Sequence, residues 1–174
     1  MVMKSRFLAG ASAALIAVSC AFPVVTSEPS PADAAATSAR LGKTEARILG
    51  LVNAERAHRG LPALAYNEQL NQMATIQAKN MARFQKMSHV LPDANLPTLG
   101  DRARYVAYPY GRLAENVALG YPDAETVVEG WMNSKGHRAN ILNSEIAETG
   151  IAIARSSAGG LYYCQVFGRR ISSL

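Results

Sequence analysis

The chain contains few of the residues from which cofactor and disulfide sites are built. Its 174 residues include two cysteines, three histidines and one tryptophan. Two cysteines are too few for a disulfide-dense mini-protein or a four-cysteine zinc site. A glycine-rich phosphate loop and the motifs G-x-S-x-G and H-E-x-x-H are also absent, so these familiar routes to nucleotide binding and hydrolysis are excluded. Any imidazole chemistry must therefore use His58, His89 or His137.

The sequence also lacks any long run of like charge. Lys and Arg number 18 against 13 Asp and Glu, a formal charge of +5, but the basic residues are scattered and no aromatic residues alternate with them. This distribution is not that of a nucleic-acid-binding surface, so we expect no nucleic-acid partner. The length allows one domain, and the sequence leaves its oligomeric state open.

The first 34 residues have the three parts of a secretory signal. Lys4 and Arg6 precede an uncharged run over 7–21, and Ala32-Asp33-Ala34 resembles an A-x-A cleavage site. The run is too short to predict a stable membrane span. We therefore predict a signal peptide over 1–34, a linker over 35–43 and a secreted domain over 44–174. The alternative is a lipoprotein signal anchored through Cys20, although the leucine preferred three residues earlier is missing.

Cleavage after Ala34 would remove Cys20 and leave Cys164 as the only thiol. A disulfide would then have to be intermolecular. Because Cys164 lies in a Tyr-Tyr-Cys-Gln-Val-Phe segment typical of a strand, we expect a buried small apolar residue rather than a nucleophile.

Hydrophobic periodicity predicts an α+β layered domain. Helices are expected over 45–60 after a Thr44 cap, over 68–87 after Asn67, from 124 after Asp123, and as a short turn over 136–142. Strands are expected over 113–118, 150–154 and 161–167, the last two as a hairpin. Prolines and glycines over 92–111 predict a long loop. On the first helix, Asn53 and Arg56 share a face with Leu49 and Val52, which indicates a buried hydrogen-bond network there.

Three residues are placed where their side chains could reach one cleft: His89 after a helix, Glu115 on a short strand and His137 at a helix start. Two imidazoles and a carboxylate could hold Zn²⁺ with an open position or act as acid and base. The spacing alone is equally consistent with a buried histidine pair whose hydrogen bonds are satisfied within the fold. His58, beside Arg59 at a helix end, is expected to lie at the surface.

The short sequence motifs around these residues resemble those of the CAP superfamily (cysteine-rich secretory proteins, antigen 5 and pathogenesis-related 1), in its bacterial SCP-domain branch. The resemblance covers about 46–168, and its most specific part is Trp131-Met132-Asn133-Ser134-Lys135-Gly136-His137-Arg138-Ala139-Asn140-Ile141-Leu142. The other motifs occur in the same order as in the family: Asn53-Ala54-Glu55-Arg56, Met87-Ser88-His89, Ala114-Glu115-Asn116-Val117-Ala118, Thr149-Gly150-Ile151-Ala152 and Tyr163-Cys164-Gln165-Val166-Phe167.

This resemblance implies a secreted, three-layer α–β–α sandwich with a small, mainly antiparallel sheet and a central cleft. His89, Glu115 and His137 match three members of the family's tetrad of two histidines and two acidic residues. Ser134 stands where the fourth, acidic member is expected, and Ala114 replaces the usual glycine before the glutamate. The resemblance also suggests a structural network, whose members would be Asn53, Arg56, Asn116, Trp131, Asn140 and Gln165.

In the family, the histidine pair of some members binds Zn²⁺ or another divalent metal, and some members bind sterols or fatty acids. We therefore expect a non-enzymatic extracellular module with a ligand-binding cleft of His89, Glu115, Ser134 and His137, in which His89 and His137 are the metal ligands. No residue is assigned a catalytic role. One alternative is a hydrolase that uses Ser134 or a bound water, although Ser134 more simply caps the following helical turn. The other is a lipid carrier or cell-envelope interaction protein, suggested by the export signal, the methionines of the second helix and the 92–111 segment.

Overall fold

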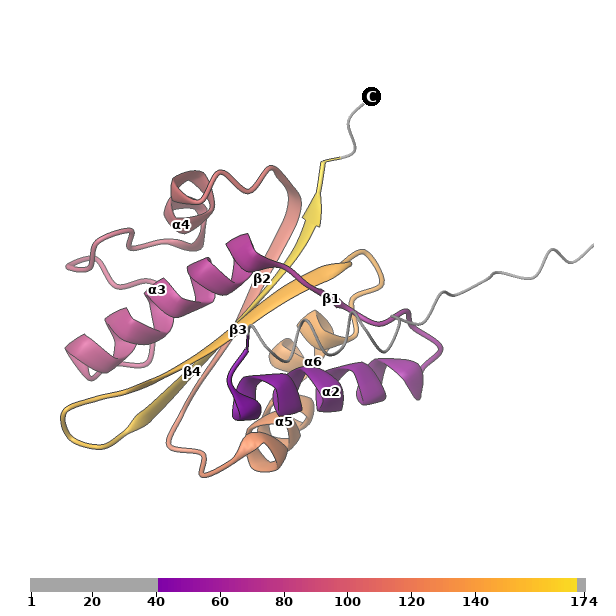
Figure 1. Cartoon of the computed structure of the whole chain (residues 1–174), viewed down its shortest axis with the longest axis horizontal. Coiled ribbons are helices and arrows are strands. Elements are labelled where there is room, and N and C mark those ends of the chain that lie inside the picture. The colour runs from indigo at the N-terminus through magenta and orange to yellow at the C-terminus, as the bar shows by residue number, and fades with distance from the viewer. Residues whose placement is uncertain (1–40, 172–174) are drawn as a thin grey trace, which may run out of the picture.

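The computed structural model describes residues 41–171, so the predicted signal peptide and Cys20 lie outside the described residues. Five helices surround a four-stranded sheet (Figure 1). The elements in chain order are α2 (Lys43–Ala57), β1 (Ala65–Tyr66), α3 (Glu68–Phe84), α4 (Leu99–Tyr105), β2 (Tyr110–Leu119), α5 (Ala124–Asn133), α6 (Lys135–Ile141), β3 (Glu148–Arg155) and β4 (Leu161–Arg170).

The sheet has the strand order β1-β3-β4-β2. β4 pairs antiparallel with both β3 and β2, whereas the two-residue β1 pairs parallel with β3. The third strand expected around Glu115 is therefore confirmed as β2, which lies at an edge of the sheet. The sequence analysis did not find β1, because two residues carry no periodicity.

Helices cover both faces of the sheet, with α3 and α4 on one face and α2, α5 and α6 on the other (Figure 1). Strand alternation divides the core between these layers. On β4, Cys164 and Val166 pack toward α3 and α4, while Tyr163 and Phe167 pack toward the other three helices. The structure thus confirms the predicted α–β–α sandwich, and Cys164 is fully buried as expected.

Local capping explains where most helices begin. The Asn67 side chain accepts from the Leu70 N–H at 3.1 Å, and Asp123 accepts from the Thr126 N–H at 2.9 Å, as predicted. The predicted Thr44 cap is wrong, because α2 already begins at Lys43 and Gly42 occupies the N-cap. Helix α3 ends at Phe84 rather than near Met87, since Gln85 adopts a left-handed conformation with φ 51°.

The predicted loop over 92–111 is wrong in its middle, where the structure forms α4. Thr98 and Asp101 make a reciprocal capping box at the start of this helix. The prolines and glycines on both sides of this helix favoured the prediction of a loop and hid the capping motif. The helix matters for the site because it carries Arg102 into the core.

Candidate functional site

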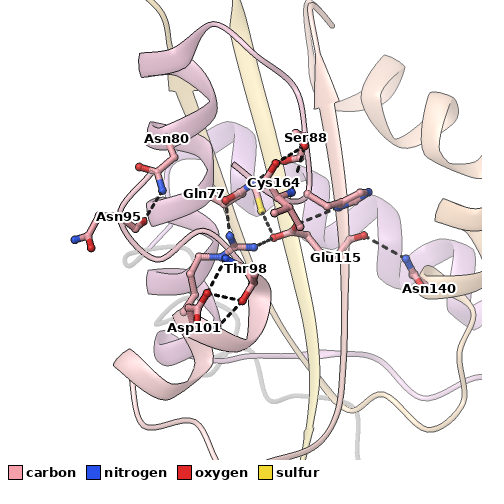
Figure 2. Close-up of polar contacts among 12 residues, drawn as sticks. Gln77, Asn80, Ser88, Asn95, Thr98, Asp101, Glu115, Asn140 and Cys164 are labelled. Carbon is pink, nitrogen blue, oxygen red and sulfur yellow. Dashed lines mark hydrogen bonds and ion pairs between the residues drawn. The ribbon is translucent and has the colours of Figure 1, made fainter. Parts of the chain in front are cut away.

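Glu115 lies at the centre of the candidate site, on the face of β2 that packs against α3 and α4. Its side chain is 3% exposed. One carboxylate oxygen, Oε1, lies 3.0 Å from His89 Nδ1, and the other, Oε2, pairs with the Arg102 guanidinium. The Cys164 thiol lies 3.5 Å from the same Oε2 (Figure 2). Both oxygens of Glu115 are therefore occupied by groups of this chain.

Arg102 and Gln77 are site residues that the sequence analysis missed. The Arg102 side chain is completely buried and donates to the side-chain oxygen of Gln77 as well as to Glu115. The Gln77 amide in turn donates to the backbone carbonyl of Ser88 at 2.6 Å (Figure 2). A buried ion pair compensates the desolvation of its charges only when further hydrogen bonds complete it, as Gln77 does here. The Thr98/Asp101 capping box was the one sequence signal for this arrangement.

His89 lies beside the site at the surface, with 55% of its side chain exposed. The hydrogen bond with Glu115 raises the pKa of His89 above its ordinary value, and the negative charge of Glu115 adds to this effect. Partial burial and the charge of Arg102 oppose it. His89 is thus an imidazole held through Nδ1, with its other ring nitrogen directed away from the carboxylate.

His137, on the first turn of α6, has the opposite electrostatic setting. Burial lowers the pKa of His137, and the charge of His89 lowers it further. The Asn116 side chain holds the His137 backbone carbonyl at 3.2 Å. Within residues 41–171 the His137 ring has no hydrogen-bond partner, so a neutral imidazole is available to a ligand.

The edge of β2 is covered from the α5 and α6 side. Asn140 donates to the Glu115 carbonyl at 3.3 Å, and the Trp131 indole donates to the Val117 carbonyl at 3.3 Å. Carbonyls two residues apart point to the same side of a strand, so these two side chains satisfy one edge of β2. Asn140 also donates to the Asn116 side chain at 2.9 Å, which ties α6 to the strand that carries Glu115.

The other residues of the expected network make contacts of their own. Asn53 exchanges two hydrogen bonds with the backbone of Leu64. Arg56, fully buried, donates to four backbone carbonyls, those of Pro62, Ile141, Asn143 and Ile146. Gln165 donates to Thr149 and lies directly opposite Asn116 in the pairing of β4 with β2. The structure thus brings Asn116, Trp131, Asn140 and Gln165 together around β2, whereas Asn53 and Arg56 bind backbone groups elsewhere.

Ser134 joins α5 to α6 in an extended conformation and takes the N-cap position of α6. The expected capping hydrogen bond from its side chain is not made. Its hydroxyl also makes no hydrogen bond to either cleft histidine among residues 41–171. Among residues 41–171 the hydroxyl is therefore not hydrogen-bonded to a base that would activate it as a nucleophile.

A metal ion at the site would need protein donors that are not already engaged by other groups. Over the described part of the chain, no three His, Cys, Asp or Glu side chains are grouped so that they could enclose a metal. Glu115 is committed to His89 and Arg102, which leaves the two imidazoles as the available protein donors. The predicted ligand pair, His89 and His137, thus stands without a third protein ligand.

Comparison with known proteins decides the family. The profile described as "CAP: Cysteine-rich secretory protein family" matches residues 49–167. This chain belongs to the CAP family. The domain includes every cleft residue discussed above, from Gln77 to Cys164.

The CAP domain resembles two Bacillus subtilis proteins. It is 33% identical to YkwD over 125 residues, which are 72% of this chain and 47% of YkwD. It is 32% identical to the membrane protein YlbC over 127 residues, which are 73% of this chain and 35% of YlbC. The matched CAP region thus spans less than half the length of each relative.

Among solved structures, this CAP domain resembles an extracellular SCP-domain protein from Bacillus anthracis, with a TM-score of 0.67 and 31% identity over 73% of this chain and 40% of that one. It also shares its fold with NaASP2, solved with Zn²⁺, with a TM-score of 0.53 and 14% identity over 77% of this chain and 83% of that one. In residues 41–171 of this protein, no helix has the length and apolar character needed to cross a membrane.

Proposed function

We propose that this protein is an exported, non-enzymatic CAP module whose cleft binds a divalent cation of the zinc class through His89 and His137. One observation carries the proposal: Glu115 holds His89 through Nδ1 at 3.0 Å and so orients its ring. His137, whose ring has no hydrogen-bond partner among residues 41–171, would be the second donor. A carboxylate behind a histidine orients the ring and raises its basicity toward a metal. Glu115 therefore orients a ligand rather than acting as one.

Metal binding requires neutral imidazoles. Burial lowers the pKa of His137 and favours its neutral form, whereas the hydrogen bond with Glu115 raises the pKa of His89, so binding is expected to weaken as the pH falls. Two protein nitrogens leave the remaining positions of a tetrahedral ion to water or to a small ligand. The bound cation would accordingly be exchangeable and would offer open positions to a second molecule. The NaASP2 structure with Zn²⁺ supports the choice of cation only at the level of a shared fold.

Calorimetric titration of Zn²⁺ into the mature domain tests the proposal. We expect measurable binding to the wild type and its loss in His89→Ala and His137→Ala. His58→Ala is the matched control, because His58 is exposed at the end of α2 and belongs to no part of the cleft. Glu115→Gln is expected to weaken binding by about 10- to 100-fold, as is usual for an orienting partner. Absence of heat in the wild type, or an equal loss in His58→Ala, would contradict the proposal.

Export forms the second part of the proposed function. It is supported by the signal-like residues 1–34 and by the extracellular B. anthracis relative. The YlbC relative, a membrane protein, supports the alternative of lipid anchoring through Cys20. Intact mass of the protein from culture medium and from the membrane fraction distinguishes the two, since a soluble product beginning at Ala35 fits secretion and a lipidated Cys20 fits anchoring.

The two alternative functions each have a direct test. Labelling by a serine-reactive probe that disappears in Ser134→Ala would favour a hydrolase over a binding module. Lipid recovered by mass spectrometry from the purified protein would favour a sterol or fatty-acid carrier. The unpartnered Ser134 hydroxyl and the polar surroundings of Glu115 favour neither.

A further inference from the structure

Four side chains and one peptide unit form a closed ring of hydrogen bonds around Glu115. Ser88 and His89 are consecutive residues, and both are reached by the ring. From the Ser88 carbonyl it passes to the Gln77 amide, then to Arg102, then to Glu115, and it returns to His89 Nδ1. Figure 2 shows Gln77, Ser88 and Glu115 facing one another in this arrangement.

Arg102 sets the direction of every hydrogen bond in the ring. Arg102 donates and never accepts, so it must meet the Gln77 oxygen and a carboxylate oxygen. The Gln77 amide nitrogen is then turned toward the Ser88 carbonyl. Glu115, paired with Arg102, presents its remaining oxygen as an acceptor, so His89 must donate from Nδ1. The ring therefore defines which nitrogen of neutral His89 carries the proton.

Stability alone is a weak explanation of this buried pair. Apolar residues of similar volume are often as stabilising as a buried ion pair. Arg102 Nε lacks a hydrogen-bond partner within the described residues, which makes the arrangement a costly one. The distinctive consequence of the ion pair is that it makes His89, the one exposed residue of the ring, donate from Nδ1.

We propose that Arg102 and Gln77 are positioning residues that hold Glu115 so that His89 stays in its Nδ1–H tautomer, with Nε2 open toward the cleft. The inference rests on the proposed function, because an open Nε2 is the nitrogen that a cation would bind. Arg102 acts through Glu115, and Gln77 acts both on Arg102 and on the backbone beside His89.

The test is long-range ¹H–¹⁵N NMR of the histidine rings in the metal-free domain at about pH 9, above the ordinary histidine pKa of about 6.5. In the wild type we expect His89 to be an Nδ1–H tautomer, opposite to the form that free histidine prefers in water. In Arg102→Met and in Gln77→Met we expect its ¹⁵N shifts to move toward the Nε2–H form. Arg102→Lys keeps the charge but has no planar fork to hold two acceptors, so it should restore the wild-type shifts only in part.

Arg104→Met is the matched control for Arg102→Met. Arg104 lies on the same helix, but it is exposed and pairs with Asp101. Asn80→Met is the control for Gln77→Met, since Asn80 also lies on α3. Its side chain donates to the backbone of Asn95, which belongs to the same connection between α3 and α4 as Ser88. Both controls should leave the His89 shifts unchanged.

An Nε2–H tautomer in the wild type would overturn the inference, as would wild-type shifts in both Arg102→Met and Gln77→Met. If Arg102→Met does not fold, Gln77→Met decides the matter, because it leaves the ion pair in place. The NMR sample contains no metal. A failure of Zn²⁺ to bind would therefore refute the proposed function without affecting the tautomer result.

Discussion

Replacement of Arg56 tests the reading of the structure most directly, because this buried cation has no carboxylate partner among residues 41–171. It links the end of α2 to the segment after α6 through four carbonyls, at distances from 2.7 to 3.3 Å. Burial lowers the pKa of Arg56, and the guanidinium still remains charged at neutral pH. In Arg56→Met the side-chain volume is largely kept, and the four acceptors lose their donor.

The size of the expected stability loss depends on which carbonyl acceptors remain shielded from water. The bonds to Ile141 and Ile146 are buried, whereas those to Pro62 and Asn143 are partly exposed and water can replace them. An orphaned buried acceptor costs about 1–3 kcal/mol, so two cost about 4 kcal/mol together. For a domain of this size that corresponds to a fall in Tm of about 12 °C.

Urea unfolding followed by circular dichroism measures this loss in the domain over 41–171. Arg59→Met is the control, since Arg59 is exposed and pairs with Glu55 one turn away. The control should change stability by less than about 0.5 kcal/mol. A loss below about 1 kcal/mol in Arg56→Met would refute the view that the buried carbonyls depend on this guanidinium.

Two further predictions concern packing and pH. In Gly150→Ala a Cβ on β3 would overlap the backbone of Leu70 and Asn71 in α3, so we expect severe destabilisation or no folded protein, whereas Gly136→Ala meets no atom within 4 Å and should stay folded by the same circular dichroism assay. The pKa of His89 is raised in the folded protein, so its contribution to stability is complete below the unfolded-state pKa of about 6.5 and is lost as pH rises through the folded-state pKa. The stability difference between wild type and His89→Gln should therefore shrink from pH 5.5 to pH 9, and a difference that stays constant would contradict the raised pKa of His89.

The predicted elements succeeded where the signal was local. The predicted caps at Asn67 and Asp123 are confirmed, because a side-chain oxygen that accepts from a backbone N–H three residues on needs no distant partner. The end of α3 was missed because Gln85, rather than glycine, takes the left-handed conformation. The α4 helix was missed because seven residues give too few turns for a periodic pattern.

The sequence by itself indicated an α+β layered domain and the burial of Cys164, because these follow from periodicity and residue type. Its resemblance to the CAP family added the α–β–α arrangement and marked His89, Glu115 and His137. Only the tertiary structure decided that Arg102 pairs with Glu115 and that Gln77 completes the pair. The physical reason is that these residues come from α3, α4 and β2, and a buried ion pair is defined by how those elements pack. Among residues 41–171, the scattered basic residues thus include two buried guanidinium groups, one bound to carbonyls and one paired with Glu115.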